Sequence, residues 1–192
     1  MPNPCSFMPN HSYTDLITLF EVCFFDKFNT RLVKGGHEPI YIPSGANAEG
    51  YSVKNYHQII FAHGFFRSAL HEVAHWLVAG DLRRLKLDYG YWYAPDGRNA
   101  RQQAEFERVE VRPQAIEWVL TKACDHAFRV SVDNLSGEAT QTMPFKKAVL
   151  QEVQALQAEG LPARAERFRQ SLAAFYGTTL VFSDQLYSLE EL

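Results

Sequence analysis

Residues 59–80 read IIFAHGFFRSALHEVAHWLVAG, and this stretch sets the fold. Apolar residues recur every three or four positions across 65–79, which predicts a helix with one buried face. Gly80 follows at the position where a left-handed cap often ends a helix. Because such a face must be buried against other elements, the rest of the fold is expected to pack around this helix.

The motif His71-Glu-Val-Ala-His75 lies in the middle of this predicted helix. Residues four positions apart lie one above the other on a helix, so both imidazoles can bind one metal ion. Two histidines that merely form hydrogen bonds at the edge of a core are the alternative. Apolar neighbours that pack the helix would hold ligand side chains in place, which favours the metal site.

A two-histidine site needs a third protein ligand and an open coordination position. Helical periodicity resumes over residues 99–127, where the chain offers Glu105, Glu107, Glu110 and Glu117. We expect Glu110 to be the ligand and Gln114, four residues later, to orient it. Glu107 lies three positions before Glu110 and is the alternative ligand. The other two glutamates are expected on the solvated helix surface.

Two reactions remain open for such a site. Glu72 lies beside the histidine pair and is the candidate catalytic residue, because it could accept a proton from metal-bound water, as in zinc metallopeptidases. Iron at the same ligands would instead leave positions free for dioxygen and a substrate, which is oxygenase chemistry. Nitrogen and oxygen ligands accept either ion, so the motif alone does not separate the two.

The remaining periodicity predicts an α+β fold in which a small sheet packs against helices in a single compact domain. Further helices are expected at 13–28, capped by Ser12 or Thr14, at 143–158 and at 162–176, and strands at 31–33, 39–42, 58–62 and 129–132. Residues 88–98 are expected to form a strand that runs into a loop. Pro113 is expected to start, kink or interrupt the helix within 99–127. Residues 1–12 are expected to form a mobile tail and 13–192 the domain.

Composition excludes several classes of protein. The 192 residues are 46% hydrophobic, which suffices for one substantial core. A net charge of -3 argues against direct nucleic-acid binding, and charged or polar residues interrupt every apolar stretch, which argues against a membrane span. The three cysteines are widely spaced and the first residues do not form a secretion signal, so a cytoplasmic location is expected.

Three blocks of the sequence closely resemble the bacterial elongation factor P hydroxylase family. They are residues 59–80, the stretch DYGYWYAPDGR at 88–98, and FERVEVRPQAIEW at 106–118, and the similarity extends over about residues 13–176. The resemblance implies hydroxylation of a lysine of elongation factor P after a β-lysyl group has been attached to that lysine. It also implies dioxygen and a divalent metal, expected to be Fe(II), bound by His71, His75 and Glu110.

The same arrangement resembles the gluzincin peptidases, in which the HExxH helix is followed by a second helix that gives the glutamate ligand. A zincin-like metal helix in a small α+β domain is therefore expected, and a gluzincin-like zinc metallopeptidase is the alternative function. For the hydroxylase, the role of Glu72 stays open between orienting water, relaying protons and an inherited position. Because the substrate side chain is cationic, carboxylates are expected along its approach, namely Asp88, Asp96 and Glu107.

Overall fold

The computed structural model describes residues 11–88, 97–132 and 142–192. Within these residues the chain forms five α-helices and a three-stranded sheet, which confirms the predicted α+β class. The helices are α1 (Tyr13–Phe28), α2 (Phe66–Val78), α3 (Ala100–Ala123), α4 (Thr142–Glu159) and α5 (Ala163–Tyr176), and the strands are β1 (Thr30–Lys34), β2 (Ile40–Ile42) and β3 (His57–Phe61). One hydrophobic core joins side chains from the sheet and from all five helices, so the expected single domain is confirmed.

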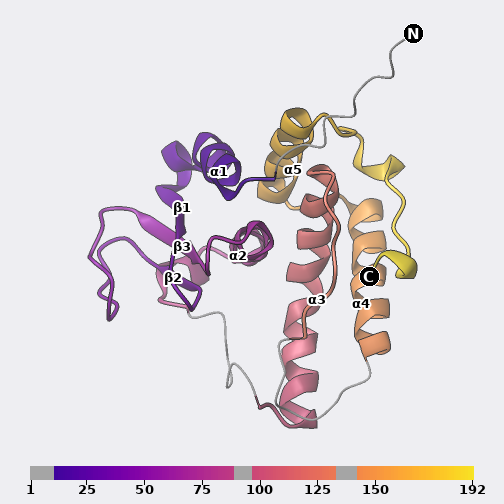
Figure 1. Ribbon diagram of the computed structural model, residues 1–192, viewed down its shortest axis with the longest axis horizontal. Coiled ribbons are helices and arrows are strands. Elements are labelled where there is room, and N and C mark those ends of the chain that lie inside the picture. The colour runs from indigo at the N-terminus through magenta and orange to yellow at the C-terminus, as the bar shows by residue number, and fades with distance from the viewer. Residues whose placement is uncertain (1–10, 89–96, 133–141) are drawn as a thin grey trace.

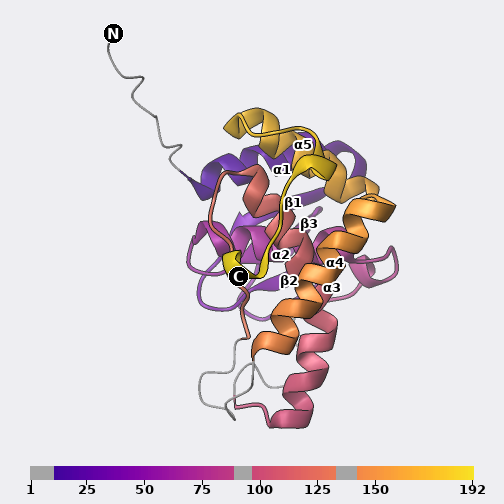
Figure 2. The same ribbon diagram turned by 90° about the vertical axis from the view of Figure 1, so that its right-hand side faces the viewer.

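Helices α2, α3 and α4 lie one after another at increasing distance from the sheet (Figure 1). Helix α1 packs on β1 and α2 packs on β3, α3 then packs against α2, and α4 lies on the far side of α3. The view turned by 90° shows α5 beside α1, above the other helices (Figure 2). The HExxH helix α2 therefore lies in the middle of the molecule, between the sheet and α3.

The sheet has the strand order β1-β3-β2, with β1 parallel and β2 antiparallel to β3. Side chains alternate between its two faces, as the period of a strand requires. Ile59 and Phe61 face the main core, whereas Ile60 packs with Ile40 and Ile42 in a small separate cluster. The strands expected at 31–33, 39–42 and 58–62 are confirmed with small shifts at their ends.

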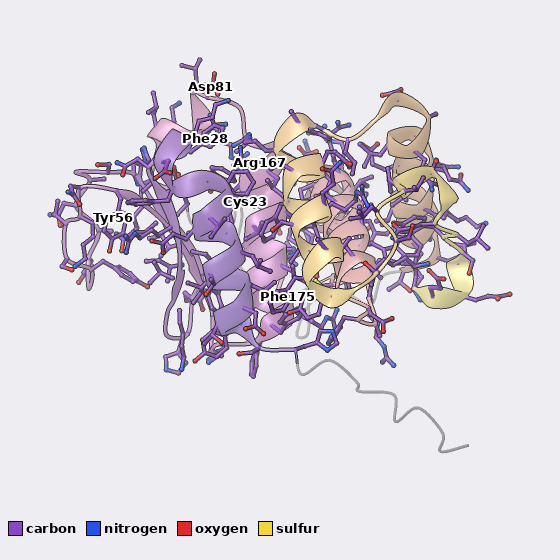
Figure 3. The ribbon with its side chains drawn as sticks, turned by 90° about the horizontal axis from the view of Figure 1, so that it is seen from above. Cys23, Phe28, Tyr56, Asp81, Arg167 and Phe175 are labelled. Carbon is purple, nitrogen blue, oxygen red and sulfur yellow. The ribbon has the colours of Figure 1, made fainter. Side chains whose placement is uncertain are left out.

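Helix α1 matches its prediction at both ends. Ser12 is the N-cap and accepts a hydrogen bond from the backbone N–H of Thr14 at 3.2 Å, while Asn29 ends the helix in the left-handed conformation. Seen from above, α1 lies side by side with α5, and Cys23 is buried between them (Figure 3). Helices α4 and α5 begin and end within one residue of the predicted positions.

The C-terminal end of α2 differs from the prediction of a left-handed Gly80. The helix ends at Ala79 in an extended conformation, and Gly80 has no positive φ. Arginines bind the last carbonyl groups instead: Arg84 donates to the Ala79 oxygen at 2.8 Å, and Arg164 of α5 donates to the Leu77 and Ala79 oxygens at 3.1 and 2.5 Å. Side chains from elsewhere thus satisfy the carbonyls that a glycine cap would otherwise serve.

Helix α3 runs through Pro113 without interruption, so the two segments that Pro113 was expected to allow are one helix. Asn99 and Gln102 form a capping box at its N-terminus. Proline removes one backbone donor, which deprives the Val109 carbonyl of its helical partner. Val109 is exposed, so water can replace that bond, and the helix continues because most of its residues from Pro113 to Ala123 are buried in the core.

The strand expected at 129–132 is not present. The backbone of this segment is bound by side chains rather than by a neighbouring strand: the Gln114 amide accepts from the Ser131 N–H at 3.0 Å and donates to the Ser131 oxygen at 2.7 Å. Arg98 also donates to the Val132 oxygen. Of the stretch expected at 88–98, residues 89–96, with Asp96, lie outside the described residues. Asp88 itself forms an isolated bridge with Tyr41.

The expected tail lies outside the described residues up to residue 10. Ser12 caps α1, and the His11 ring forms a hydrogen bond with the Cys124 carbonyl at 2.6 Å. None of the described helices has the length and hydropathy that crossing a bilayer requires.

Candidate metal centre

Helices α2 and α3 bring three potential metal ligands together. His71 and His75 lie one turn apart on α2, and Glu110 reaches them from the adjacent α3. Each offers one ligand atom, and these atoms all lie within 4.8 Å of one another. Among the residues that the structure describes, this is the one such group of histidine, cysteine or acidic side chains.

The spacing of the donor atoms fits one shared cation. Two donors that each lie about 2.1 Å from an ion are roughly 3.0 to 3.4 Å apart at octahedral or tetrahedral angles. The two Nε2 atoms of His71 and His75 are 3.1 Å apart, and Glu110 Oε1 lies 3.2 Å from His75 Nε2. Glu110 Oε2 is 3.8 Å from His71 Nε2, slightly outside this range. Two imidazoles and one carboxylate form a donor set that suits divalent metals.

Glu110 is buried and stays negatively charged. Burial alone would raise the pKa of its carboxyl, but His75 and His71, with hydrogen bonds from His75 and Gln114, hold that pKa at about 2. The Gln114 amide nitrogen donates hydrogen bonds to Glu110 Oε2 at 3.3 Å and to the Ser131 carbonyl oxygen at 2.7 Å. Gln114 thus connects the carboxylate to the segment that follows α3.

Glu117 is the site residue that the sequence analysis placed wrongly. It is buried rather than solvated, and its Oε2 accepts a hydrogen bond from His71 Nδ1 at 2.8 Å. The sequence does hold a signal for this position: Glu117 lies seven residues after Glu110, which places both on one face of α3. Its neighbours Ile116 and Trp118 are also buried.

The electrostatics of His71 are dominated by carboxylates. Burial by itself would lower the pKa of this imidazole, but the charges of Glu117, Glu110 and Glu72 and the hydrogen bond to Glu117 raise it to about 10. In the absence of a metal ion the cluster therefore holds a proton on His71. A bound cation would satisfy the same carboxylates and replace that proton.

The other two glutamates of α3 lie apart from the donor group. Glu107 accepts a hydrogen bond from Gln103 at 3.0 Å, and Glu105 forms an ion pair with Arg108 on the helix surface, as expected. Glu110, rather than Glu107, is thus the glutamate that the structure places beside the histidines.

Comparison with known proteins agrees with this geometry. Residues 19–186 match the family described as Elongation factor P hydroxylase. The chain belongs to this family. It is also 51% identical over 168 residues to the Elongation factor P lysine hydroxylase of Haemophilus influenzae, an alignment that covers 88% of this chain and 91% of that protein. Membership in a hydroxylase family favours the oxygenase interpretation of the metal centre over the peptidase alternative.

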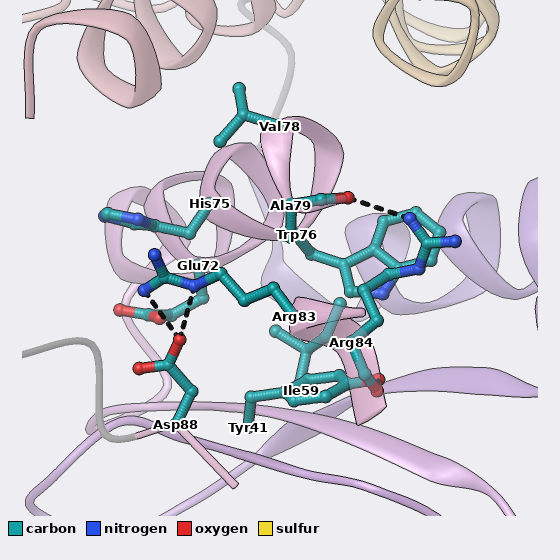
Figure 4. A pocket seen from close by; sticks show the side chains of 10 residues that line it. All are labelled: Tyr41, Ile59, Glu72, His75, Trp76, Val78, Ala79, Arg83, Arg84 and Asp88. Carbon is teal, nitrogen blue, oxygen red and sulfur yellow. Dashed lines mark hydrogen bonds and ion pairs between the residues drawn. The ribbon is translucent and has the colours of Figure 1, made fainter. Parts of the chain in front are cut away.

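A pocket lies next to the candidate metal centre, and His75 is part of its lining. Figure 4 shows its two ends. One end holds the charged or titratable groups of His75, Glu72, Arg83 and Asp88. The other holds Tyr41, Ile59 and Trp76, with Arg84 beside Trp76. The Asp88 carboxylate accepts hydrogen bonds from Arg83 Nε at 2.7 Å and Nη2 at 2.6 Å. Sequence reasoning identified Asp88 as a candidate but missed its pairing with Arg83.

Glu72 lines this pocket beside His75. Burial raises the pKa of its carboxyl, the positive charges of His71 and His75 oppose the rise, and the nearby Glu110 and Glu117 add to it. The net effect is a raised pKa, so Glu72 takes up a proton more readily than an ordinary glutamate.

Proposed function

We propose that this protein hydroxylates a lysine side chain of elongation factor P, in its β-lysylated form, at a non-haem iron centre with dioxygen as cosubstrate. The observation that carries the proposal is the 51% identity to the Haemophilus influenzae lysine hydroxylase, which extends over most of both chains. The cluster of His71, His75 and Glu110 supports it, because two imidazoles and a carboxylate suit Fe(II) and leave positions for other ligands. The protein acts in the cytoplasm, where translation takes place.

The reaction requires a redox-active metal. A ferrous ion bound with dioxygen supplies an oxidant strong enough for an unactivated C–H bond, which a zinc-bound water does not. In this proposal His71, His75 and Glu110 hold the ion. Glu110 contributes a full negative charge because its pKa is held at about 2.

The residues around the ligands hold them in place. Glu117 accepts the Nδ1 hydrogen of His71, which fixes the tautomer that leaves Nε2 free to bind a metal. Gln114 performs the corresponding role for Glu110 by donating to its Oε2. Glu72 is not one of the three ligands. Its raised pKa suits it to hold or deliver a proton at its carboxylate beside the reacting group.

The substrate enters through the pocket lined by Asp88. A lysine chain is cationic, so a carboxylate along its path offsets the cost of removing it from water. Asp88 fits this role because it shares the pocket with His75 and Glu72. Asp96 remains a second candidate. Glu107 has the weaker claim, since it binds Gln103 and is not among the described residues that line the pocket.

The test uses iron-loaded protein prepared without oxygen and then mixed with β-lysylated elongation factor P, oxygen and a chemical reductant. The reductant supplies the two electrons that convert the second oxygen atom of dioxygen to water. We expect mass spectrometry to find one added oxygen atom on the acceptor lysine. A matched zinc-loaded sample is expected to add none. Cleavage of peptides by the zinc-loaded sample, with no hydroxylation by the iron-loaded one, would instead establish the gluzincin-like peptidase.

A further inference from the structure

The segment at residues 81–88 exposes apolar side chains and contributes three residues to the lining of the pocket. It follows α2 and contains a short 3-10 turn, Arg83–Leu85. Leu82 is 79% exposed, Leu85 67% and Leu87 37%. Single exposed leucines are ordinary, but three exposed leucines within six residues concentrate apolar surface in one segment, and concentrated apolar surface is typical of sites that bind another molecule.

The packing of this segment is inverted relative to an ordinary surface turn. The charged residue Arg84 faces inward, with its side chain 16% exposed and its guanidinium over the rings of Trp76 and Phe28 at 5.8 and 5.6 Å. The neighbouring Leu82 and Leu85 face the solvent. Inside the fold, Arg84 is satisfied by its ion pair with Asp81 at 2.5 Å and by its hydrogen bond to the Ala79 carbonyl. The leucines, by contrast, gain little packing within the chain, so their apolar surface is open to another molecule.

The segment is also held firmly in this conformation. The Tyr41 hydroxyl donates to the Arg84 carbonyl at 2.9 Å, and Arg84 donates to the Ala79 carbonyl at 2.8 Å. Asp88 exchanges two backbone hydrogen bonds with Tyr41, at 2.7 and 3.1 Å. A surface that is ordered before it binds loses little conformational entropy on association, which favours affinity.

The location of the segment indicates which partner it meets. Arg83, Arg84 and Asp88 line the pocket that leads to His75 and Glu72. The pocket has a cavity volume of about 70 Å³, far below the roughly 300 Å³ of a typical ligand pocket, so the backbone of a protein partner stays outside it. The stem carbons of a lysine lie within about 5 Å of its own Cα. The backbone of any protein that inserts a lysine here must therefore approach the rim of the pocket.

The charge of residues 81–88 indicates which kind of protein surface they would bind. Arg83 pairs with Asp88 and Arg84 pairs with Asp81, so Lys86 gives the segment a positive charge, although the whole chain has a net charge of -3. The exposed Lys86 lies between Leu85 and Leu87. A partner face that combines apolar and acidic side chains around its lysine complements this mixture.

We infer that residues 81–88 are the docking surface for the protein that carries the target lysine. The partner is a folded protein whose lysine lies within an apolar face with acidic side chains. This inference rests on the proposed function, which names that protein as elongation factor P. Leu82 and Leu85 supply the apolar contact, and Lys86 supplies charge attraction.

The decisive variant replaces both outward leucines, Leu82→Ser with Leu85→Ser, and the matched control is Val22→Ser with Leu186→Ser. Val22 and Leu186 are similarly exposed, at 74% and 84%, but lie on α1 and after α5. Binding of β-lysylated elongation factor P is measured by titration calorimetry, with the thermal midpoint of unfolding as a check on folding. We expect the Leu82 and Leu85 variant to bind about tenfold or more weakly and its KM to rise accordingly. The control is expected to bind like the wild type.

Three outcomes overturn the inference. One is a Leu82 and Leu85 variant that binds as tightly as the wild type, and another is an equal loss in the control. The third is sedimentation showing that the wild type self-associates and the variant does not, because the leucines would then join two copies of this chain. If the wild type adds no oxygen to elongation factor P, the proposed function is refuted. That result is distinct from the three above, because it is obtained from the mass of the product and not from binding.

The charged part of the surface has its own test with Lys86→Glu. We expect this variant to bind β-lysylated elongation factor P more weakly than the wild type at low salt and to approach it at high salt, because salt screens exposed charges. Equal affinities of the two proteins at low salt would show that Lys86 does not face acidic side chains of the partner.

Discussion

His71 Nδ1 and the Glu117 carboxylate form a 2.8 Å hydrogen bond that joins α2 to α3 directly behind the candidate metal ligand. The other ring nitrogen, Nε2, faces His75 and Glu110. Glu117 therefore determines which nitrogen of His71 carries the hydrogen and which presents its lone pair to a cation. The buried carboxylate would thus act on a bound metal through the ring, without being one of the three candidate ligands.

Removing this carboxylate is expected to weaken metal binding without eliminating it. We predict that Glu117→Ala lowers the affinity for Fe(II) about 10- to 100-fold, the usual effect of losing a partner that orients a ligand. Competition with a chromophoric chelator under anaerobic conditions measures the affinity. Glu105→Ala, on the exposed part of the same helix, is the control. Wild-type affinity in Glu117→Ala would show that His71 does not depend on Glu117.

Metal binding is expected to release a proton. In the metal-free protein the pKa of His71 is raised to about 10, so this ring is protonated at neutral pH and must lose its proton to bind a cation. We predict that metal affinity rises as the pH is raised from 7 toward 10. Calorimetry at pH 7 in buffers of different ionisation enthalpy is expected to detect release of about one proton. Affinity that does not change over this range would contradict the raised pKa.

Glu72→Gln separates a proton role from a metal role. Glu72 is not part of the three-residue donor group, so the variant is expected to bind iron like the wild type. Because the raised pKa of Glu72 suits proton transfer and glutamine cannot titrate, we predict that turnover falls about 100-fold or more. Iron content and the rate of oxygen incorporation are measured on the same sample. Full activity would dismiss a proton role for Glu72.

The Arg83–Asp88 ion pair predicts opposite effects for its two members. If Asp88 receives the cationic substrate, Asp88→Asn is expected to raise KM for β-lysylated elongation factor P several-fold. Arg83→Met is expected to lower KM, because the Arg83 guanidinium, which binds Asp88 in the wild type, no longer competes with the substrate cation. Asp26→Asn, an exposed aspartate of α1, serves as the control. A rise in KM in both variants would indicate that the pair only supports the local structure.

Much of this site could be predicted from the sequence because its signals are local. The spacing of His71 and His75 and the four-residue interval from Glu110 to Gln114 follow from helix geometry alone. The predictions that were wrong concern features that depend on contacts between residues far apart in the chain. Gly80 does not cap α2 because Arg164, 85 residues beyond Ala79, binds the last carbonyls. Residues 129–132 form no strand because the Gln114 amide forms hydrogen bonds with both the N–H and the carbonyl oxygen of Ser131.

Glu117 illustrates the same limit within the metal centre. Its distance of two helical turns from Glu110 was visible in the sequence, but a glutamate on a long helix is usually solvated. Only the packing of α3 against α2 shows that this carboxylate is buried against His71. Local periodicity therefore identified the candidate ligands, whereas the group that orients one of them required the tertiary structure.

The most direct test of the metal centre measures Fe(II) stoichiometry in the wild type and in two glutamate variants of α3 by anaerobic titration with elemental analysis. We predict one equivalent of iron in the wild type and in Glu107→Gln, and less than about a tenth of an equivalent in Glu110→Gln under the same conditions. One full equivalent in Glu110→Gln, or its loss in Glu107→Gln alone, would contradict a site formed by His71, His75 and Glu110.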